Sequence, residues 1–343
     1  MSAIAGHQHD VLTITEAWQR EGRALALATV AETWGSAPRP VGSHLIIDSD
    51  GNFEGSVSGG CVEGAVVVEA EEAIRDGKPR FLTFGVADET AWNVGLSCGG
   101  RISVLVQPLA ETEGNAATLI AALNEARSGR RPVLLASDIE TGRSQLVGDD
   151  DKADPALMDR LRQGSSGIVE LGAAKLMATV YVPPPRLVLL GAVHISQALA
   201  PMAASAGFDV SVVDPRTAFA TEERFRGVRF LPEWPQDALP KTGLDRFTAF
   251  AALTHDPKID DPGLTAALEA QCFYIGALGS RKTHGKRLER LREAGVGKPA
   301  LNRIHAPIGL AIGARSPAEI AVAVLAEIIE AKNTSGTLAE AAA

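Results

Sequence analysis

Hydrophobic positions in the first half of the chain follow two patterns, helical spacing and short apolar runs bounded by turn residues. Apolar residues that recur every three or four positions predict helices, whereas short apolar runs predict strands. The predicted helices are 11–21, 62–74 and 119–127. The predicted strands are 24–30, 44–48, 53–57, 78–84, 101–107, 133–136, 144–147 and 173–181. We expect the last three strands to belong to an outer sheet, and the mixture predicts an α+β domain.

The pattern changes after Pro183, Pro184 and Pro185, which form a stiff spacer rather than part of a helix or strand. Beyond them, buried apolar strands alternate with helices, as in a doubly wound parallel sheet. These strands are 187–190, 209–213, 247–253 and 273–277, and a last helix starts after Ser316. We therefore expect an α/β protein with an N-terminal α+β domain (1–182), a Rossmann-like doubly wound C-terminal domain (183–332) and a disordered tail (333–343).

Composition narrows the class of protein. The 343 residues carry a formal net charge of −9, which argues against nucleic-acid binding because such proteins present a basic face. No apolar run approaches the roughly 20 residues that span a bilayer, and the start of the chain lacks the basic and apolar segments of a signal peptide. Three cysteines form neither a disulfide framework nor a C-x-x-C zinc motif. These features favour a cytoplasmic protein.

A glycine- and serine-rich turn, residues 55–64, leads directly into the predicted helix 62–74. Such a turn directs several N–H groups, together with the positive end of the helix dipole, toward one point and can hold an anion. Ser56 and Ser58 add hydroxyls, and Cys61 adds a thiol near the expected helix N-terminus, a position that favours a thiolate. The alternative is a tight turn in which Cys61 fills the core.

Two further loops carry candidate chemistry in the N-terminal domain. Arg39 lies between two prolines in the loop 33–42, which holds its guanidinium outward as a partner for phosphate or carboxylate. This loop and the turn at 55–64 flank one predicted hairpin, so both can face one pocket. The loop 95–100 is a second glycine-rich loop with a thiol, Cys98. A solvated surface arginine is the alternative role for Arg39.

In the C-terminal domain, the ligand crevice of a doubly wound sheet lies at the carboxyl ends of the strands. Residues with polar or charged side chains follow these strands, namely His194, Asp214, Thr254, His255, Asp256, Ser280 and Arg281. The dinucleotide motif G-x-G-x-x-G is broken, because Val193 stands where the second glycine lets the backbone approach a pyrophosphate. An ordinary NAD site is therefore disfavoured.

With these residues in hand, the chain resembles the xanthine dehydrogenase accessory protein family (XdhC), including the CoxI type from carbon monoxide dehydrogenase operons. The resemblance covers nearly the whole chain. It rests on the segments 33–42, 55–63, 95–100, 191–196, 253–257, 274–284 and 304–313. Two positions depart from the pattern of many relatives: Val193 replaces the dinucleotide-type glycine, and Ala311 replaces an acid.

The resemblance implies a chaperone for the molybdenum cofactor. Such a protein binds molybdopterin as cargo, holds it while a cysteine desulfurase supplies the sulfido ligand, and delivers it to a xanthine dehydrogenase-type molybdenum hydroxylase. It implies a maturation factor without a catalytic residue, a homodimer among the expected states, and no assigned metal ligand. The candidate cofactor-binding residues are Arg39, Ser56, Ser58, Gly59, Gly60, Cys61, Glu63, Cys98, Gly99, Gly191, His194, Asp214, His255, Asp256, Ser280 and Arg281.

Two other functions stay open at this point. The first is an NAD(P)- or nucleotide-dependent oxidoreductase that uses the C-terminal crevice. The second is a sulfur-transfer protein that works through Cys61 and Cys98. The third cysteine, Cys272, lies next to Phe273 at the start of an apolar strand and is predicted to be part of the core.

Overall fold

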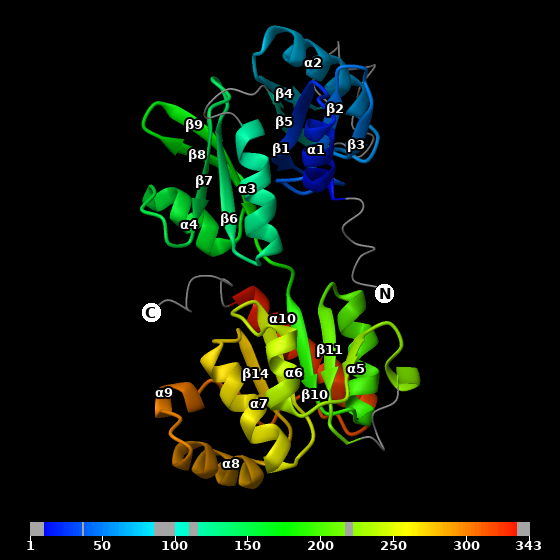
Figure 1. Cartoon of the computed structure of the whole chain (residues 1–343), viewed down its shortest axis with the longest axis vertical. Coiled ribbons are helices and arrows are strands. Elements are labelled where there is room, and N and C mark those ends of the chain that lie inside the picture. Colours follow the sequence, from blue (N-terminus) through cyan, green and yellow to red (C-terminus); the bar gives the residue numbers. More distant parts are fainter. Residues whose placement is uncertain (1–9, 36–37, 86–99, 110–115, 217–221, 335–343) are drawn as a thin grey trace. The chain divides into compact units, whose positions relative to one another are not determined.

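The computed structural model describes residues 10–35, 38–85, 100–109, 116–216 and 222–334. The chain divides into two units between Pro183 and Pro184, and each unit is described by itself (Figure 1). The predicted fold class is confirmed, because an antiparallel α+β unit precedes a unit built on a parallel sheet.

The first sheet of the N-terminal unit is antiparallel, with strand order β3-β2-β1-β5-β4. Its strands are β1 (Leu25–Trp34), β2 (His44–Asp48), β3 (Phe53–Gly55), β4 (Arg80–Phe84) and β5 (Arg101–Pro108). Helix α2 (Glu63–Asp76) packs on one face, against Ala26 and Ala28. Helices α1 (Val11–Arg20) and α3 (Ala116–Ser128) pack on the other, against Leu25 and Leu27. Alternate residues of β1 therefore pack into two different hydrophobic cores, one on each face of the sheet.

A second antiparallel sheet completes the N-terminal unit, with strand order β7-β6-β9-β8. Its strands are β6 (Val133–Asp138), β7 (Ser144–Gly148), β8 (Gly167–Leu171) and β9 (Ala174–Tyr181). Helix α4 (Pro155–Gln163) covers this sheet with Leu157 and Leu161. The sequence pattern predicted neither α4 nor β8. Because α4 buries little more than one pair of leucines four residues apart, its apolar periodicity is too short to stand out.

The sheet of the C-terminal unit is parallel, with strand order β12-β11-β10-β13-β14-β15. Its strands are β10 (Arg186–Leu190), β11 (Asp209–Val213), β12 (Arg229–Leu231), β13 (Thr248–Ala252), β14 (Tyr274–Ala277) and β15 (Ile304–His305). In order along the sheet this is the 3-2-1-4-5-6 arrangement of dinucleotide-binding folds. The short strands β12 and β15 were not predicted.

Helices cover both faces of this sheet, which explains why its strands are continuous apolar runs. Helices α5 (His194–Ser205) and α10 (Pro317–Thr334) pack on the face of Leu187 and Leu189. Helices α6 (Pro235–Thr242) and α7 (Pro257–Glu269) pack on the face of Val188 and Leu190. The remaining helices are α8 (Arg281–Glu293), α9 (Lys298–Leu301) and the short 3-10 helix Glu222–Phe225.

The end of α10 corrects one prediction. The helix continues to Thr334, so the first two residues of the predicted disordered tail, Asn333 and Thr334, are helical. The rest of that tail lies outside the described residues. Within the described ranges, no helix is both long and apolar enough to cross a membrane.

A buried polar cluster joins the two sheets of the N-terminal unit. The ring of His44 on β2 lies between two hydroxyls, with Nδ1 3.0 Å from Thr29 Oγ1 and Nε2 2.7 Å from Tyr181 Oη on β9. Next to it, Arg127 of α3 forms two hydrogen bonds of 2.8 Å with Asp10, whose carboxylate caps α1. Burial, together with the nearby charge of Arg127, lowers the pKa of His44 to about 4.

This cluster makes the stability of the protein depend on pH. Between pH 6.5 and 4 the unfolded chain protonates His44 but the native protein does not, so stability falls as the pH falls through this window. The expected loss is about 3 kcal/mol. His44→Gln should flatten this slope, and the exposed His194 provides the control, His194→Gln. Denaturant titrations at several pH values measure it; an unchanged slope in His44→Gln would contradict the assignment.

Candidate functional site

The turn at 55–64 is filled by a carboxylate of the chain itself. The side chain of Glu63, the first residue of α2, turns back and accepts hydrogen bonds from the Ser56 hydroxyl (2.8 Å) and from the N–H groups of Ser58 and Gly60 (2.9 Å each). It also accepts from the Ser58 hydroxyl and from Val57 N–H. Burial alone would raise the pKa of Glu63, but hydrogen bonds from Ser58 and Ser56 hold it at about 2. The donors that the sequence suggested for an external anion thus point at Glu63.

The loop of Arg39 does reach this turn. Arg39 is exposed, and its Nε donates to the carbonyl oxygen of Ser56 at 3.3 Å. Gly59 and Gly60 have φ values of +75° and +112°, which glycine adopts readily. An anion held by Arg39 would therefore bind beside a turn that already contains one carboxylate.

In the C-terminal unit, the carboxyl ends of β10 and β13 meet at the topological switch point, where ligands bind in this class of fold. Gly191 follows β10 with φ of +121°, and a Cβ atom at this position would lie 2.8 Å from Thr254 Cγ2. Only glycine therefore fits against the Thr254 loop. His194, three residues later, is the first residue of α5 and is exposed.

Asp214, at the end of β11, is engaged within the chain. It is fully buried, accepts a 2.7 Å hydrogen bond from Ala192 N–H and forms an ion pair with Arg216 at 2.7 Å. Burial alone would raise the pKa of Asp214, but the hydrogen bonds from Arg216 and Ala192 hold it below its usual range. In a dinucleotide site an acid near this position binds ribose. Here that acid instead fixes the turn after β10, which weakens the case for NAD.

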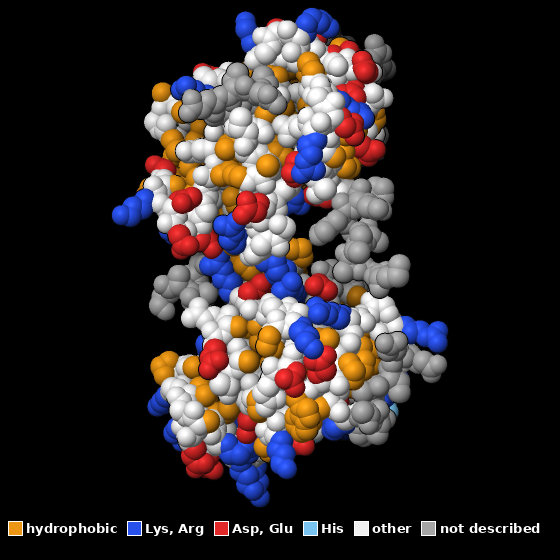
Figure 2. Space-filling view, in the orientation of Figure 1, with side chains coloured by type: hydrophobic (Ala, Val, Ile, Leu, Met, Phe, Trp, Pro, Cys, Tyr) orange, Lys and Arg blue, Asp and Glu red, His pale blue; other side chains and the backbone are white. Residues whose placement is uncertain are grey.

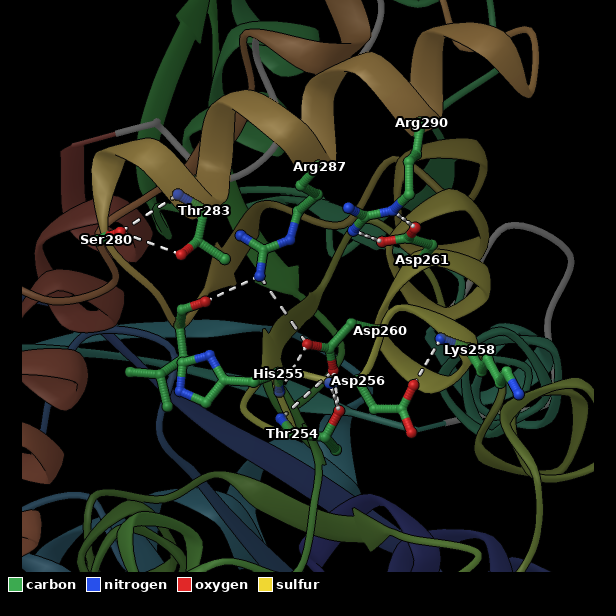
Figure 3. A network of polar contacts seen from close by, with 11 residues as sticks. Thr254, His255, Asp256, Lys258, Asp260, Asp261, Ser280, Thr283, Arg287 and Arg290 are labelled. Carbon is green, nitrogen blue, oxygen red and sulfur yellow. Dashed lines mark hydrogen bonds and ion pairs between the residues drawn. The ribbon is translucent and has the colours of Figure 1, made fainter.

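The loop after β13 is held by a second buried acid (Figure 3). Asp260, on the first turn of α7, accepts hydrogen bonds from Thr254 Oγ1 (2.6 Å) and from His255 N–H (3.0 Å). His255 itself has φ of +65°, an uncommon value for a residue with a side chain, and is exposed. Asp256 caps α7 by accepting from Lys258 N–H at 2.9 Å. Asp256, a predicted site residue, thus caps a helix. Asp260 was not among the predicted site residues.

Arg287 lies opposite Asp260, on α8, and is 2% exposed. Its Nη2 donates to the carbonyl oxygen of Leu278 at 2.8 Å and lies 3.9 Å from Asp260 Oδ2. Its Nε and Nη1 have no hydrogen-bond partner among the described residues. Burial lowers the pKa of Arg287 and raises that of Asp260, which means that each charge is incompletely compensated by the other.

These residues line a pocket of about 330 Å³ between α7 and α8. The lining residues are His255, Pro257, Asp260, Lys282, Thr283, Lys286, Arg287 and Arg290. Figure 2 shows Lys and Arg side chains over α8, at the bottom of the view. Of the predicted site residues, only His255 belongs to this lining. Ser280 caps α8 by accepting from Thr283 N–H at 3.2 Å, and Arg281 is exposed. The cations of α8 that line the pocket were not among the predicted site residues, although the spacing of Lys282, Lys286 and Arg290 by four residues was a usable signal.

Comparison with known proteins identifies the family. The model of the XdhC Rossmann domain matches residues 187–328, and that of the XdhC and CoxI family matches residues 18–85. The molybdenum cofactor insertion chaperone PaoD of Escherichia coli (strain K12) is 32% identical over 309 residues, which is 90% of this chain and 83% of PaoD. The chain belongs to the XdhC and CoxI family.

Two other similarities extend over nearly the whole length of this family member. A Bacillus subtilis (strain 168) protein, described as a probable xanthine dehydrogenase component, is 27% identical, covering 93% of this chain and 97% of that protein. A crystal structure described as a xanthine dehydrogenase from Bacillus halodurans aligns with a TM-score of 0.63 and 23% identity, over 97% of this chain and 98% of that one. The structural likeness supports the fold of the family in both units.

The thiols of this family member lie in different surroundings. Cys61 is half-buried just before α2 and packs against the core under that helix. Cys272 is fully buried, as predicted, and burial raises its pKa to about 12. Cys98 and Gly99 lie outside the described residues. In the part of the chain that the structure describes, no group of three or more His, Cys, Asp or Glu side chains could hold a metal ion.

The Glu63 contacts predict a cost for neutralising that side chain. Glu63→Gln replaces one acceptor oxygen by an amide that cannot accept, leaving buried donors unpaired, and should lower the free energy of unfolding by about 2–3 kcal/mol at pH 7. Because the pKa of Glu63 is lowered, the wild-type advantage should disappear as the pH falls from 4.5 toward 2. Denaturant titration measures both effects. Glu72→Gln, an exposed change on the same helix, should have little effect.

The thiol environments predict different reactivity. In a Cys98→Ser background, Cys61 should react with a soluble alkylating reagent while Cys272 stays protected until the protein unfolds, since the thiolate is the nucleophile. Peptide mass spectrometry at successive times separates the two sites. Faster labelling of Cys272 than of Cys61 in the folded protein would be incompatible with these positions.

Proposed function

We propose that this protein is a chaperone that binds the molybdenum cofactor and delivers it to a molybdenum hydroxylase of the xanthine dehydrogenase type. The observation that carries the proposal is the relationship to PaoD across 90% of the chain. A binding and transfer protein needs a site that releases its cargo, and it does not need an acid, base or nucleophile for turnover. We also propose that the cofactor stays bound while a cysteine desulfurase supplies its sulfido ligand.

Each unit supplies one candidate cofactor site. In the N-terminal unit, Arg39 lies against the turn that contains Glu63. In the C-terminal unit, the candidates are the residues after β10 and β13, among them Gly191, His194 and His255. Of these residues His255 borders a pocket with cationic lining and an incompletely bonded arginine, features that suit an anionic cargo and favour the C-terminal unit.

A nucleotide-dependent oxidoreductase is the second candidate, because the strand order of the C-terminal sheet is that of dinucleotide-binding folds. Two observations count against it. Val193 is the residue before α5, where the backbone of a dinucleotide site approaches the pyrophosphate, and Asp214 is bound to Ala192 and Arg216.

Cofactor content separates the two functions. After co-expression with the enzymes of molybdenum cofactor synthesis, the purified protein should release a pterin on denaturation, at a level well above that of an unrelated Rossmann protein prepared in parallel. Titration with NAD should show no saturable binding. Tight NAD binding without extractable pterin would reject the chaperone function.

Arg39 variants then test the N-terminal candidate. Loss of pterin from Arg39→Ala with an unchanged Tm would identify a cofactor contact, which Arg39→Lys should restore only in part because lysine lacks the planar guanidinium. A lowered Tm with pterin retained would make Arg39 a structural residue.

A further inference from the structure

We propose that the pocket between α7 and α8 is a phosphate-binding site in which Arg287 is the buried anchor and Lys282 and Lys286 are the outer cations. The pocket belongs to the C-terminal unit, whereas the glycine-rich turn at 55–64, whose donors bind Glu63, belongs to the N-terminal unit. This inference depends on the proposed function only for the identity of the molecule that carries the phosphate.

The first argument is the incomplete bonding of Arg287. A guanidinium that is removed from water normally has its donors satisfied, because unpaired buried donors and charges are costly. Here one nitrogen donates to Leu278, while Nε and Nη1 have no partner in the described part of the chain. The side chain extends from its helix toward Asp260 (Figure 3) and lines the pocket. An oxyanion in the pocket would supply the missing acceptors once the guanidinium turned toward it.

Asp260 does not supply them, because its carboxylate is turned toward the N–H groups and hydroxyl of its own loop and lies beyond hydrogen-bond distance of Arg287. Oδ1 accepts from Thr254 N–H and Oγ1, and Oδ2 accepts from His255 N–H. The closest approach of Arg287 to this carboxylate, 3.9 Å, is longer than a hydrogen bond. The role of Asp260 is to fix the His255 loop, and it leaves the donors of Arg287 available to a ligand.

The second argument is the charge of the lining. Arg290 is neutralised by Asp261, with hydrogen bonds of 2.6 and 3.0 Å. This leaves the three cationic side chains of Lys282, Lys286 and Arg287 against the single carboxylate of Asp260, an excess of about two formal positive charges in the lining. Lys282 and Lys286 are four residues apart on one helix, a spacing at which like charges repel. A bound anion would relieve this repulsion.

The size and charge of the site favour phosphate over a simple carboxylate. A doubly charged phosphate matches the excess charge, and its several oxygens can accept from Arg287 and from both lysines at the same time. The volume of about 330 Å³ is at the lower end for ligand pockets, enough for a phosphate and part of the group that carries it.

Titration with inorganic phosphate, pyrophosphate and chloride at constant ionic strength tests the site on the full-length protein. Calorimetry should show saturable binding of phosphate or pyrophosphate, and Tm should rise with either but not with chloride. Lys286→Gln should weaken binding by about 10-fold and Arg287→Gln by about 10- to 150-fold. Arg292→Gln, an exposed change on the same helix outside the lining, should bind like the wild type.

Lys286→Gln keeps the test decisive if Arg287→Gln fails to fold, because Lys286 is exposed. Absence of saturable phosphate binding to the wild type would overturn the proposal. So would equal affinities of Lys286→Gln and Arg292→Gln.

Competition identifies the source of the phosphate. A nucleoside monophosphate and the extracted pterin cofactor are each titrated against bound pyrophosphate, and the compound that displaces it at the lower concentration is the better ligand. Displacement by either supports the site, and displacement by neither, despite pyrophosphate binding, would overturn its role as a phosphate-ester site. If pterin co-purifies with the protein but the protein binds neither phosphate nor pyrophosphate, only this inference is refuted. If the protein binds phosphate but no pterin can be extracted from it, only the chaperone function is refuted.

Discussion

Several turns in this structure depend on one interaction, a buried carboxylate that accepts hydrogen bonds from neighbouring backbone N–H groups. Glu63 does this before α2, Asp214 does it for the turn after β10, and Asp260 does it for the loop after β13. Each acid is less than a tenth exposed, so its charge must be compensated inside the protein. Backbone N–H groups supply part of this compensation, together with two serine hydroxyls for Glu63 and the guanidinium of Arg216 for Asp214, and each acid in return fixes its turn.

This arrangement changes the meaning of a glycine-rich turn at the start of a helix. In many nucleotide-binding proteins the N–H groups of such a turn remain open to a phosphate. At Gly60 and Ala192 of this protein they are bound to Glu63 and Asp214. The groups left to bind an anion are therefore side chains of α8 rather than the N–H groups of these turns. Among them, Arg287 is buried without a complete set of acceptors.

The fold was more predictable than the site, for reasons visible in particular elements. Strands β10, β11, β13 and β14 are apolar runs because both faces of the sheet are covered, so hydrophobicity alone locates them. Helix α4 buries only Leu157 and Leu161 and escaped the same analysis. Glu63 lay within a predicted motif, but spacing along the chain does not tell whether a carboxylate turns back into its own turn. Arg287 is one of several cations on α8, and only its burial distinguishes it from the others.

The excess of cations in the α7–α8 pocket has a kinetic consequence in a chain whose formal net charge is −9. An anion far from the protein is repelled by the whole molecule, whereas one within a few ångströms of the pocket is attracted by Lys282, Lys286 and Arg287. Dissolved salt screens the long-range repulsion over about 8 Å at physiological ionic strength and acts less on partly buried charges. Moderate salt should therefore hasten the encounter of an anionic ligand with this protein, the reverse of the usual electrostatic steering, in which an oppositely charged surface draws the ligand in and salt slows its arrival.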